Sequence, residues 1–380
     1  MRLNLRESAC YPLMRLLYRF DHRLRLLADY RPDDVRCILL ISSTALGDTV
    51  LSTAAMVAVR KSFPTARITA LIHRDYVPLF RQCSFLDEVI AYHGGYRQFF
   101  RTLRILRHAQ PDVAMILHGN EPQATPLAYL AGARFIFKLP NTSRFAFLLT
   151  NAYPRRGWAD LPRHGMHVRL ATAELAGARI ADARMYLPVP APAREHVAYW
   201  LAQHGVVATD TVIGLQAGAS SRGRMWPVAH FIALAKMLLT MHSACRFVIT
   251  GAPRERARCE AIAQGIGGGA ALAVTALPIE ALPALVERCA VLVTGDTGTL
   301  HVAVALGTLT VALFAVSDPA ASGPAYDLDK HIVIYRPNGE GIGSKTDDDY
   351  WMAQITPEEV FHEVKRQLER VGDMGKVRHV

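Results

Sequence analysis

Short apolar runs alternate with longer stretches of helical periodicity over most of the chain. In the first half, the runs predict strands at Arg36–Ile41, Arg67–Ile72, Glu88–Tyr92, Asp112–Leu117 and Arg134–Lys138. The stretches between them predict helices at Asp48–Ser62, Tyr96–His108, Pro122–Ala131 and His167–Ala176. Continuous apolar strands that alternate with helices are typical of a mostly parallel sheet with helices on both faces.

The same alternation restarts after a proline-rich stretch, Pro188–Pro192, which predicts a linker. Beyond it we expect strands at Val212–Gln216, Arg246–Thr250, Ala290–Thr294 and Leu309–Phe314. Helices are expected at Pro227–Thr240, Pro253–Ile262, Ile279–Arg288 and Thr299–Leu306. The repetition predicts two doubly wound α/β domains. Ligands of such sheets bind beyond the carboxyl ends of the strands, so we expect the site in a cleft between the domains.

The predicted organisation comprises a basic N-terminal segment at residues 1–35, a first domain at 36–187, the hinge at 188–192, a second domain at 193–355, and a C-terminal helix and tail at 356–380. The last helix has a clear start, because Thr356 and Glu359 have the spacing of a capping box around Pro357. Thr297–Ser317 contains no Asp, Glu, Lys or Arg, but Gly307 divides it. It therefore predicts a buried helix, a turn and a strand instead of a membrane span.

Charge and cysteine content narrow the partners only partly. The 380 residues carry a formal net charge of +10 at pH 7. Such an excess favours nucleic acid, anionic lipid or a phosphorylated substrate as a partner, and does not choose among them.

None of the six cysteines belongs to a CxxC pair. We therefore expect reduced, buried thiols and no zinc or dithiol site.

The N-terminal segment is basic and amphipathic. Arginines interrupt its apolar runs, so no secretory signal is predicted. An apolar stripe at helical spacing comprises Leu13, Leu17, Phe20, Leu24 and Leu27, and most of the arginines fall off it. Such a helix can lie on an anionic membrane surface, or it can pack on the first domain as an extra helix. Both interpretations stay open at this point.

The loop after the first strand holds the first candidate for chemistry. It reads Ser43-Thr44-Ala45-Leu46-Gly47-Asp48, and a helix follows. A carboxylate at a helix N-terminus is stabilised as an anion, and Asp48 at the mouth of the cleft could act as a general base. The alternative is an N-cap aspartate with no chemical role.

Three candidate groups lie in the second domain. The loop from Gln216 to Pro227 contains Ser220, Ser221 and Arg224, and its small residues suit a diphosphate; the alternative is a flexible basic loop. Glu255 follows the next strand and could bind ribose hydroxyls or complement a helix N-terminus. Asp296 ends a buried strand, and the backbone N–H groups of Thr297 and Gly298 are expected to face an anion.

Other signals are weaker. His301 lies one turn into the helix that follows Asp296, either as a half-buried structural histidine or as a ligand contact. Asp347-Asp348-Asp349 looks like a metal-binding run, but no partner ligand lies nearby in sequence, so we expect a solvated loop. Neither GxGxxG after the first strand nor GxxxxGK[ST] is present.

Taken together, the motifs resemble glycosyltransferase family 9, the lipopolysaccharide heptosyltransferases. The similarity runs from about Arg36 to the final helix, in the order of the family. The matching blocks are Ser43–Asp48, Arg224–Pro227, Gly251–Glu255, Asp296–His301 and Ala303–Thr308. The last pair of blocks, D-[ST]-G-x-x-H before A-x-A-L-G-T, is the most specific.

The resemblance implies a GT-B fold and an inverting, metal-independent glycosyl transfer. It makes Asp48 the general base. It assigns the donor to Ser220, Ser221, Arg224, Glu255, Asp296, Thr297, Gly298 and His301. The implied donor is a nucleotide sugar, by default ADP-heptose, with no other cofactor. The implied acceptor is an anionic lipid-linked saccharide, reached from the cytoplasm or the inner-membrane surface, and nucleic acid is not an expected partner.

The sequence departs from the family at three positions. Arg224 stands where the family has Lys, Gln216 where it often has His, and Phe314-Ala315 where it has Phe-Gly. Arginine keeps the charge but not the geometry, so another nucleotide sugar stays open as donor. A sugar-nucleotide epimerase and a non-catalytic sugar-nucleotide-binding protein are the alternative functions.

Overall fold

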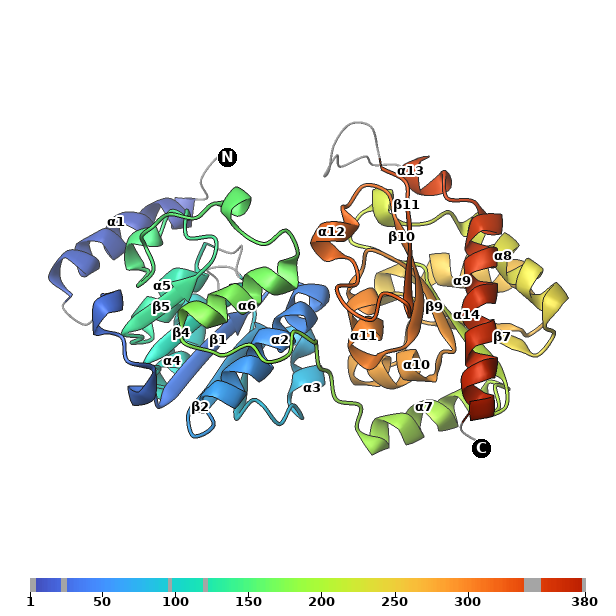
Figure 1. Ribbon diagram of the computed structural model, residues 1–380, viewed down its shortest axis with the longest axis horizontal. Coiled ribbons are helices and arrows are strands. Elements are labelled where there is room, and N and C mark those ends of the chain that lie inside the picture. Colours follow the sequence, from blue (N-terminus) through green and yellow to red (C-terminus); the bar gives the residue numbers. More distant parts are fainter. Residues whose placement is uncertain (1–4, 22–25, 95–97, 119–121, 338–349, 378–380) are drawn as a thin grey trace. The chain divides into compact units, whose positions relative to one another are not determined.

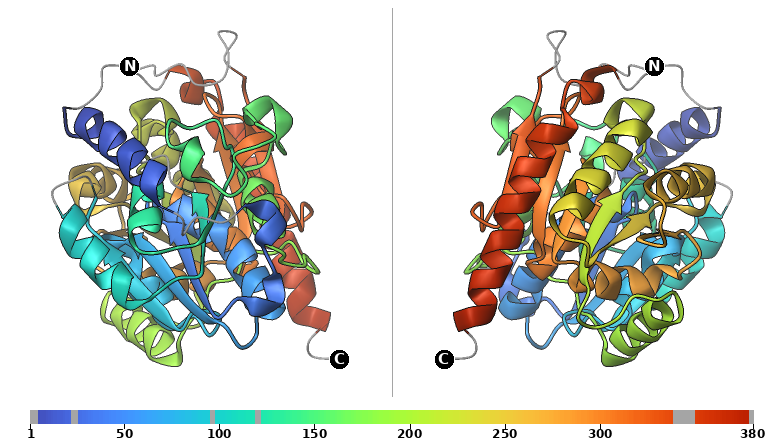
Figure 2. Two further views of the ribbon diagram at one scale, coloured as in Figure 1. Left: turned by 90° about the vertical axis from the view of Figure 1, so that its left-hand side faces the viewer. Right: turned by 90° about the vertical axis from the view of Figure 1, so that its right-hand side faces the viewer.

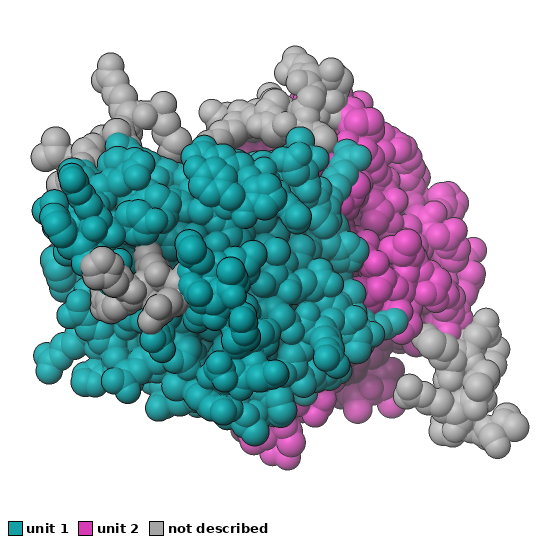
Figure 3. Space-filling model, turned by 60° about the vertical axis from the view of Figure 1, so that its left-hand side comes forward, with its two compact units in different colours: residues 1–186 teal, residues 187–380 magenta. Residues whose placement is uncertain are grey.

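The computed structural model describes residues 5–21, 26–94, 98–118, 122–337 and 350–377. The chain divides into two compact units, Met1–Tyr186 and Leu187–Val380 (Figure 3). Each unit is built around one parallel sheet with helices packed against it, which is the arrangement that the alternating pattern predicted (Figure 1).

The sheet of the first unit has five parallel strands in the order β3-β2-β1-β4-β5. The strands are β1 (Cys37–Ser42), β2 (Arg67–His73), β3 (Glu88–Tyr92), β4 (Val113–His118) and β5 (Phe135–Lys138). All five agree with the predicted runs to within one residue. The central strands β1, β2 and β4 are buried along most of their length, which a parallel strand covered on both faces requires, whereas the edge strands β3 and β5 are only half-buried.

Helices cover both faces of this sheet. One face, lined by Leu39 and Ile41, packs against α4 (Phe99–His108) and α5 (Ala124–Leu130). On the opposite face α2 (Leu46–Ser62) and α6 (Gly165–Leu175) pack against each other and on β4. The short α3 (Val77–Phe80) follows β2. The predicted helices therefore exist, with ends that shift by up to three residues.

The N-terminal helix α1 (Leu5–Phe20) docks on the first unit through a face that the sequence did not single out. Met14 is almost fully buried, and Cys10 and Tyr11 pack around it against the core. The Tyr11 and Tyr18 rings contact Phe147 edge to face, and the Arg15 guanidinium stacks over the same ring. The described members of the predicted stripe, Leu13, Leu17, Phe20 and Leu27, are exposed, and Leu24 lies outside the described residues.

The sheet of the second unit has six parallel strands in the order β11-β10-β9-β6-β7-β8. They are β6 (Thr211–Gln216), β7 (Cys245–Thr250), β8 (Ala271–Val274), β9 (Val291–Gly295), β10 (Leu309–Phe314) and β11 (His331–Tyr335). Four of them were predicted. β8 and β11, which lie at the two edges and are only partly buried, were not predicted.

The helices of the second unit form two layers. α8 (Val228–Met241), α9 (Arg256–Ile266) and α14 (Pro357–Val377) cover one face, and Figure 2 shows α14 running along the strands. α7 (Ala191–Gln203) and α10 (Leu282–Arg288) cover the other face, with α11 (Gly298–Leu306) beside α10. The short α12 (Pro319–Ser322) and α13 (Tyr350–Ala353) complete the unit. α7 was not predicted, and it contains Ala191 and Pro192 from the end of the expected linker.

Two local predictions are confirmed. Glu359 accepts a hydrogen bond from the Thr356 N–H at 3.0 Å, and Thr356 Oγ1 accepts one from the Glu359 N–H at 3.3 Å, which is the capping box of α14. Thr297–Ser317 folds as α11, a left-handed turn at Gly307 and β10. Among the described residues, no helix is both long and apolar enough to cross a bilayer.

None of the six cysteines, all of which the structure describes, forms a disulfide. Four of them are buried as the sequence predicted, and Cys10 and Cys37 are only partly buried. Burial raises the pKa of Cys83 and of Cys289 to about 12 in each case. These thiols are therefore protonated at neutral pH and poorly nucleophilic.

Candidate functional site

In the first unit, the candidate base Asp48 lies near the topological switch point of the sheet. This point lies between β1 and β4, because β2 and β3 follow β1 on one side and β4 and β5 lie on the other. Ser42 at the end of β1 is paired with His118 at the end of β4. Loops that leave such a switch point diverge, and the space beyond the strand ends is where doubly wound sheets bind ligands. Asp48 lies in the first turn of α2, which directly follows β1.

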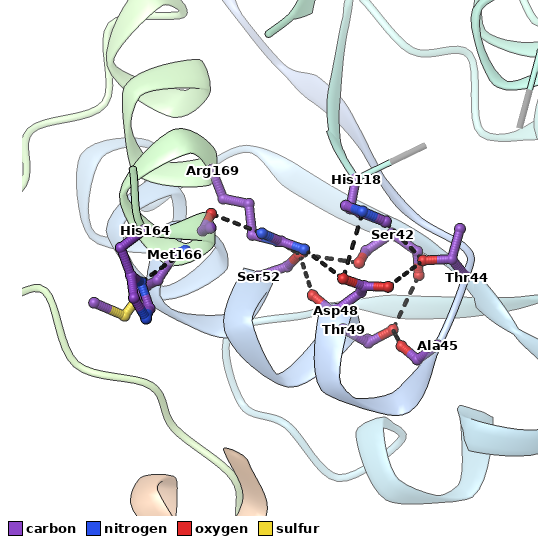
Figure 4. Close-up of polar contacts among 11 residues, drawn as sticks. Ser42, Thr44, Ala45, Asp48, Thr49, Ser52, His118, His164, Met166 and Arg169 are labelled. Carbon is purple, nitrogen blue, oxygen red and sulfur yellow. Dashed lines mark hydrogen bonds and ion pairs between the residues drawn. The ribbon is translucent and has the colours of Figure 1, made fainter. Parts of the chain in front are cut away.

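Three side chains from three different segments hold the Asp48 carboxylate (Figure 4). Arg169 Nη2 of α6 lies 2.9 Å from Asp48 Oδ1. The Thr44 hydroxyl donates a hydrogen bond to Asp48 Oδ2 at 2.9 Å. His118 Nε2 lies 3.4 Å from Oδ1. The Asp48 side chain is still 29% exposed, so a hydroxyl of a bound molecule can reach it.

The N-cap alternative for Asp48 is wrong. Ala45 occupies the N-cap position of α2, and no side chain caps this helix end. Asp48 lies three residues further on, and its carboxylate turns to the tertiary partners described above. The base role stays a prediction, because contacts alone do not measure proton transfer.

Arg169 is a buried cation that needs the Asp48 charge. Its Nε donates to Ser52 Oγ at 3.0 Å and its Nη1 to the Gly165 carbonyl at 2.6 Å. Burial lowers the pKa of Arg169, and the ion pair with Asp48 acts in the opposite direction. A buried guanidinium without a carboxylate costs several kcal/mol, on the order of 3–5 for a fully buried pair. Asp48 therefore serves the fold as well as any chemistry.

His118 is neutral at physiological pH. Burial and the positive charge of Arg169 lower the pKa of His118 to about 4, against the opposing influence of Asp48. Lys138, at the end of β5, adds to this lowering. Burial also lowers the pKa of Lys138 itself, to about 8. The His118 Nδ1 atom lies 2.6 Å from Thr44 Oγ1.

Sequence reasoning missed both His118 and Arg169. A signal for His118 existed, since it directly follows the predicted strand Asp112–Leu117 at the edge where ligands bind. No comparable signal existed for Arg169. It lies inside a helix far from any glycine-rich loop, and only packing of α6 on α2 brings it to Asp48.

In the second unit, the corresponding switch point lies between β6 and β9, and Gln216 organises it. Its Oε1 accepts hydrogen bonds from Thr250 Oγ1 at 2.8 Å and from Thr299 Oγ1 at 2.9 Å. Its Nε2 donates to the Gly218 carbonyl at 3.0 Å. One amide thus connects the ends of β6 and β7, the following loop and α11. An amide can donate and accept at once, which this position requires.

Two of the predicted donor residues form an ion pair. Arg224 Nη1 lies 3.2 Å from Asp296 Oδ2, and the Asp296 side chain is 9% exposed against 37% for Arg224. A Cβ atom on Gly295 would lie only 2.7 Å from the Arg224 carbonyl oxygen. Glycine at 295 therefore permits the loop of Arg224 to lie directly on the end of β9.

The loop before α8 is anchored at both ends and open in the middle. The buried Trp226 donates from Nε1 to the Ile355 carbonyl at 2.8 Å, and Arg258 Nε donates to the Ala217 carbonyl at 2.9 Å. The loop is thus anchored by hydrogen bonds at both ends, while Ser220 and Ser221 between them are exposed; the diphosphate role stays a prediction.

Glu255 performs the structural role that the sequence allowed. Its Oε2 accepts a hydrogen bond from the Ala252 N–H at 2.7 Å, within its own turn. The same oxygen would lie 1.8 Å from a Cβ on Gly218, so the carboxylate lies against the loop that follows β6. The ribose role stays a prediction.

The residues after β9 form the start of α11. Thr297 is the N-cap and Gly298 the first helical residue, both partly exposed. Thr297 Oγ1 lies 3.0 Å from Thr294 Oγ1. His301, which the structural interpretation expected to be half-buried, is buried in this helix; a donor contact stays a prediction.

Within the ranges that the structure describes, no group of three or more His, Cys, Asp or Glu side chains is arranged to hold a metal ion. The acidic run Asp347–Asp349 lies outside the described residues.

Comparison with known proteins gives a family match for part of the chain. Residues 172–345 match the model of glycosyltransferase family 9 (heptosyltransferase). The chain is 24% identical over 353 residues to lipooligosaccharide heptosyltransferase 2 of Haemophilus influenzae, with 87% of this chain and 99% of that protein covered.

Solved structures show the same architecture. A glycosyl transferase family 9 protein from Veillonella parvula superposes with a TM-score of 0.74 at 20% identity, covering 89% of this chain and 98% of the other. ADP-heptose LPS heptosyltransferase II of E. coli gives a TM-score of 0.74 at 22% identity, covering 88% and 99%. The predicted GT-B class, with two Rossmann-like units, is confirmed.

Proposed function

Because residues 172–345 of this chain belong to glycosyltransferase family 9, the heptosyltransferase family, we propose that it transfers heptose from ADP-heptose to a saccharide of the lipopolysaccharide core. The protein is a glycosyltransferase. The names of the Haemophilus and E. coli proteins support heptose as the sugar, and the E. coli name supports ADP as its carrier. The observation that carries the proposal is the pair of charged switch points: a partly exposed carboxylate, Asp48, on the first unit and an Arg224–Asp296 ion pair on the second.

The second unit holds the donor. Arg224 lies beside the N-terminus of α11, and a guanidinium together with helix N–H groups suits a diphosphate. Asp296 orients Arg224, and the exposed hydroxyls of Ser220 and Ser221 add hydrogen bonds. Thr297 and Gly298 lie against the phosphates and the sugar, with Glu255 toward the ribose and His301 supporting the helix. Negative charge grows on the diphosphate as it leaves, so these donors bind the transition state more strongly than the substrate.

The first unit supplies the base. Asp48 removes the proton from a hydroxyl of the acceptor, and that oxygen attacks the anomeric carbon on the side opposite the nucleotide. Such a displacement inverts the anomeric configuration through an oxocarbenium-like transition state. The charge that a metal ion would neutralise is met by Arg224 and the start of α11, so the reaction proceeds without a metal.

The test is product analysis in the presence of EDTA. We expect ADP-heptose and a heptose-deficient lipooligosaccharide to give free ADP and a glycoside of inverted configuration, at a rate that EDTA leaves unchanged. An isomeric nucleotide sugar in place of a glycoside would contradict transfer. A rate lost in EDTA and restored by Mg²⁺ or Mn²⁺ would contradict the metal-free mechanism.

A second test compares two nucleotides. ADP should raise the melting temperature of the protein more than UDP does, because a ligand that binds the folded state more tightly stabilises it more.

We also propose that the enzyme works from the cytoplasm at the anionic inner-membrane surface, which α1 contacts. Cys10, Tyr11 and Met14 face the core, whereas Leu13, Leu16, Leu17 and Phe20 are exposed at helical spacing on the other side. Arg15 and Arg19 lie on the same helix, and the chain has a net charge of +10. Arginines beside exposed leucines suit the headgroup region of an anionic bilayer, where a lipid-linked acceptor is held.

The membrane prediction calls for substitutions and not for deletion, because removing α1 would expose the core around Met14. The triple variant Leu16→Gln, Leu17→Gln, Phe20→Ser should fold, bind ADP and no longer sediment with anionic liposomes. Burying each such side chain contributes about 1.5–3 kcal/mol, so three suffice to abolish binding. Leu328→Gln, at an exposed leucine of the second unit, is the matched control. Sedimentation of the triple variant at the wild-type level would refute membrane contact by α1.

A further inference from the structure

The contacts around Asp48 form a closed ring that lacks one proton. Three heavy-atom contacts define it: His118 Nδ1 to Thr44 Oγ1 at 2.6 Å, Thr44 Oγ1 to Asp48 Oδ2 at 2.9 Å, and Asp48 Oδ1 to His118 Nε2 at 3.4 Å. Each contact needs one proton between its two atoms. An ionised Asp48, a neutral imidazole and one hydroxyl supply only two.

The distances indicate which contact lacks the proton. The hydroxyl of Thr44 donates to Asp48, so it cannot also donate to the imidazole. His118 must therefore carry its proton on Nδ1, donated to Thr44 Oγ1 across the shortest contact. The remaining contact, Nε2 to Oδ1, then brings two lone pairs together, and it is the longest of the three.

Resting on the proposed function, we propose that His118 is a positioning residue for the base, and that the ring of Asp48, Thr44 and His118 receives the proton of the acceptor hydroxyl. When the acceptor O–H bond breaks, its oxygen bonds to the anomeric carbon, and the electron pair of the breaking sugar–oxygen bond goes to the departing diphosphate. The proton passes to Asp48 Oδ1 and is shared with His118 Nε2. After product release it leaves to water.

The charged surroundings explain why the base needs this partner. Arg169 on α6 donates to Asp48 Oδ1 and stabilises the ionised carboxylate, which by itself makes the carboxylate reluctant to accept a proton. Among the described residues, Lys138 on β5 is a second cation whose charge acts on His118, and burial with these cations lowers the pKa of His118 to about 4. The imidazole is therefore neutral and keeps its Nε2 lone pair for the arriving proton.

The kinetic test compares His118→Phe with a matched control. His73 also ends a strand, and its Nδ1 atom lies 3.5 Å from Asp75 Oδ2. It does not belong to the hydrogen-bonded ring of Asp48, Thr44 and His118. His118→Phe should lower kcat by about 10²-fold, the lower end of a general base contribution, with both KM values little changed. The acid limb of its kcat–pH profile should move to lower pH. Protonated Asp48 would no longer donate a hydrogen bond to His118 Nε2, so the protonated form of Asp48 would be less stable. His73→Phe should change neither quantity.

A structural role for His118 would lower kcat without moving the acid limb, and that result would overturn the ring. ¹⁵N NMR of the His118 imidazole nitrogens tests the hydrogen-bonded ring of Asp48, Thr44 and His118 without any enzymatic reaction. It therefore separates failure of this proposal from failure of the proposed function. Wild-type His118 should be the Nδ1–H tautomer. Thr44→Val removes the acceptor of that proton and should convert His118 to Nε2–H, donated to Asp48. A wild-type Nε2–H tautomer, or no change in Thr44→Val, would refute the proposal.

Discussion

Asp48→Asn should lower kcat by about 10²–10⁴-fold, the usual contribution of a general base, while ADP binding stays near the wild-type value. The amide keeps the size of the carboxylate, and its single oxygen can still accept the hydrogen bond from Arg169. Its NH2 group cannot accept the hydrogen bond from Thr44, and the amide cannot take the acceptor proton. The measurement is kcat at saturating donor and acceptor, with ADP affinity measured separately by calorimetry. The nucleotide should bind normally, because the residues proposed for it all lie in the second unit.

The same substitution should reduce stability, and this effect must be separated from the loss of chemistry. Arg169 would lose the countercharge of its buried guanidinium. The free energy of unfolding should fall by less than the about 3–5 kcal/mol of a fully buried pair, because the Asp48 side chain is 29% exposed. Asp75→Asn, at the strand-end pair His73–Asp75, is the control for both measurements. A folded Asp48→Asn enzyme with near-normal kcat would leave Asp48 with the structural role alone.

Arg224→Ala should lower kcat/KM by about 10²–10³-fold, comparable to removing one donor that stabilises a developing oxyanion. Nucleotide diphosphate binding should weaken as well, since a charge-assisted contact is lost in the ground state. Arg224→Lys should be milder, because the charge remains and the family usually has Lys at this position. Steady-state kinetics with ADP-heptose and ADP calorimetry measure the two effects.

Arg222→Ala is the matched control for Arg224→Ala, because it removes an exposed arginine from the same short turn. Loss of the Arg224 guanidinium also leaves the buried Asp296 carboxylate without its partner, so melting temperatures must accompany the kinetics. Equal losses in the Arg222→Ala and Arg224→Ala variants would show a general charge effect of the loop instead of a specific diphosphate contact.

The sequence predicted those parts of the fold whose cause is local. Leu309–Phe314 matches β10 residue for residue, because a central parallel strand must be apolar on both faces. Glu88–Tyr92 matches β3 equally well, although β3 lies at the edge of its sheet. Thr356 and Glu359 marked the start of α14, since both partners of a capping box lie within one turn. The edge strands β8 and β11 were missed although their sequences, Ala-Leu-Ala-Val and His-Ile-Val-Ile-Tyr, are largely apolar. An apolar run of four or five residues does not by itself distinguish a strand from a buried helix segment.

What the sequence determined by itself is the order of the elements, and with it the edge of each sheet at which Asp48, Gln216 and Asp296 lie. Only the tertiary structure decided the partners of these residues. Arg169 reaches Asp48 because α6 packs on α2, and Arg224 reaches Asp296 because its loop lies on Gly295. It also decided which face of α1 is buried, since the aromatic residues that select Met14 over the leucines come from the segment around Phe147, far along the chain. Periodicity reports a residue's neighbours within one element, whereas an ion pair or a docking face depends on which elements meet.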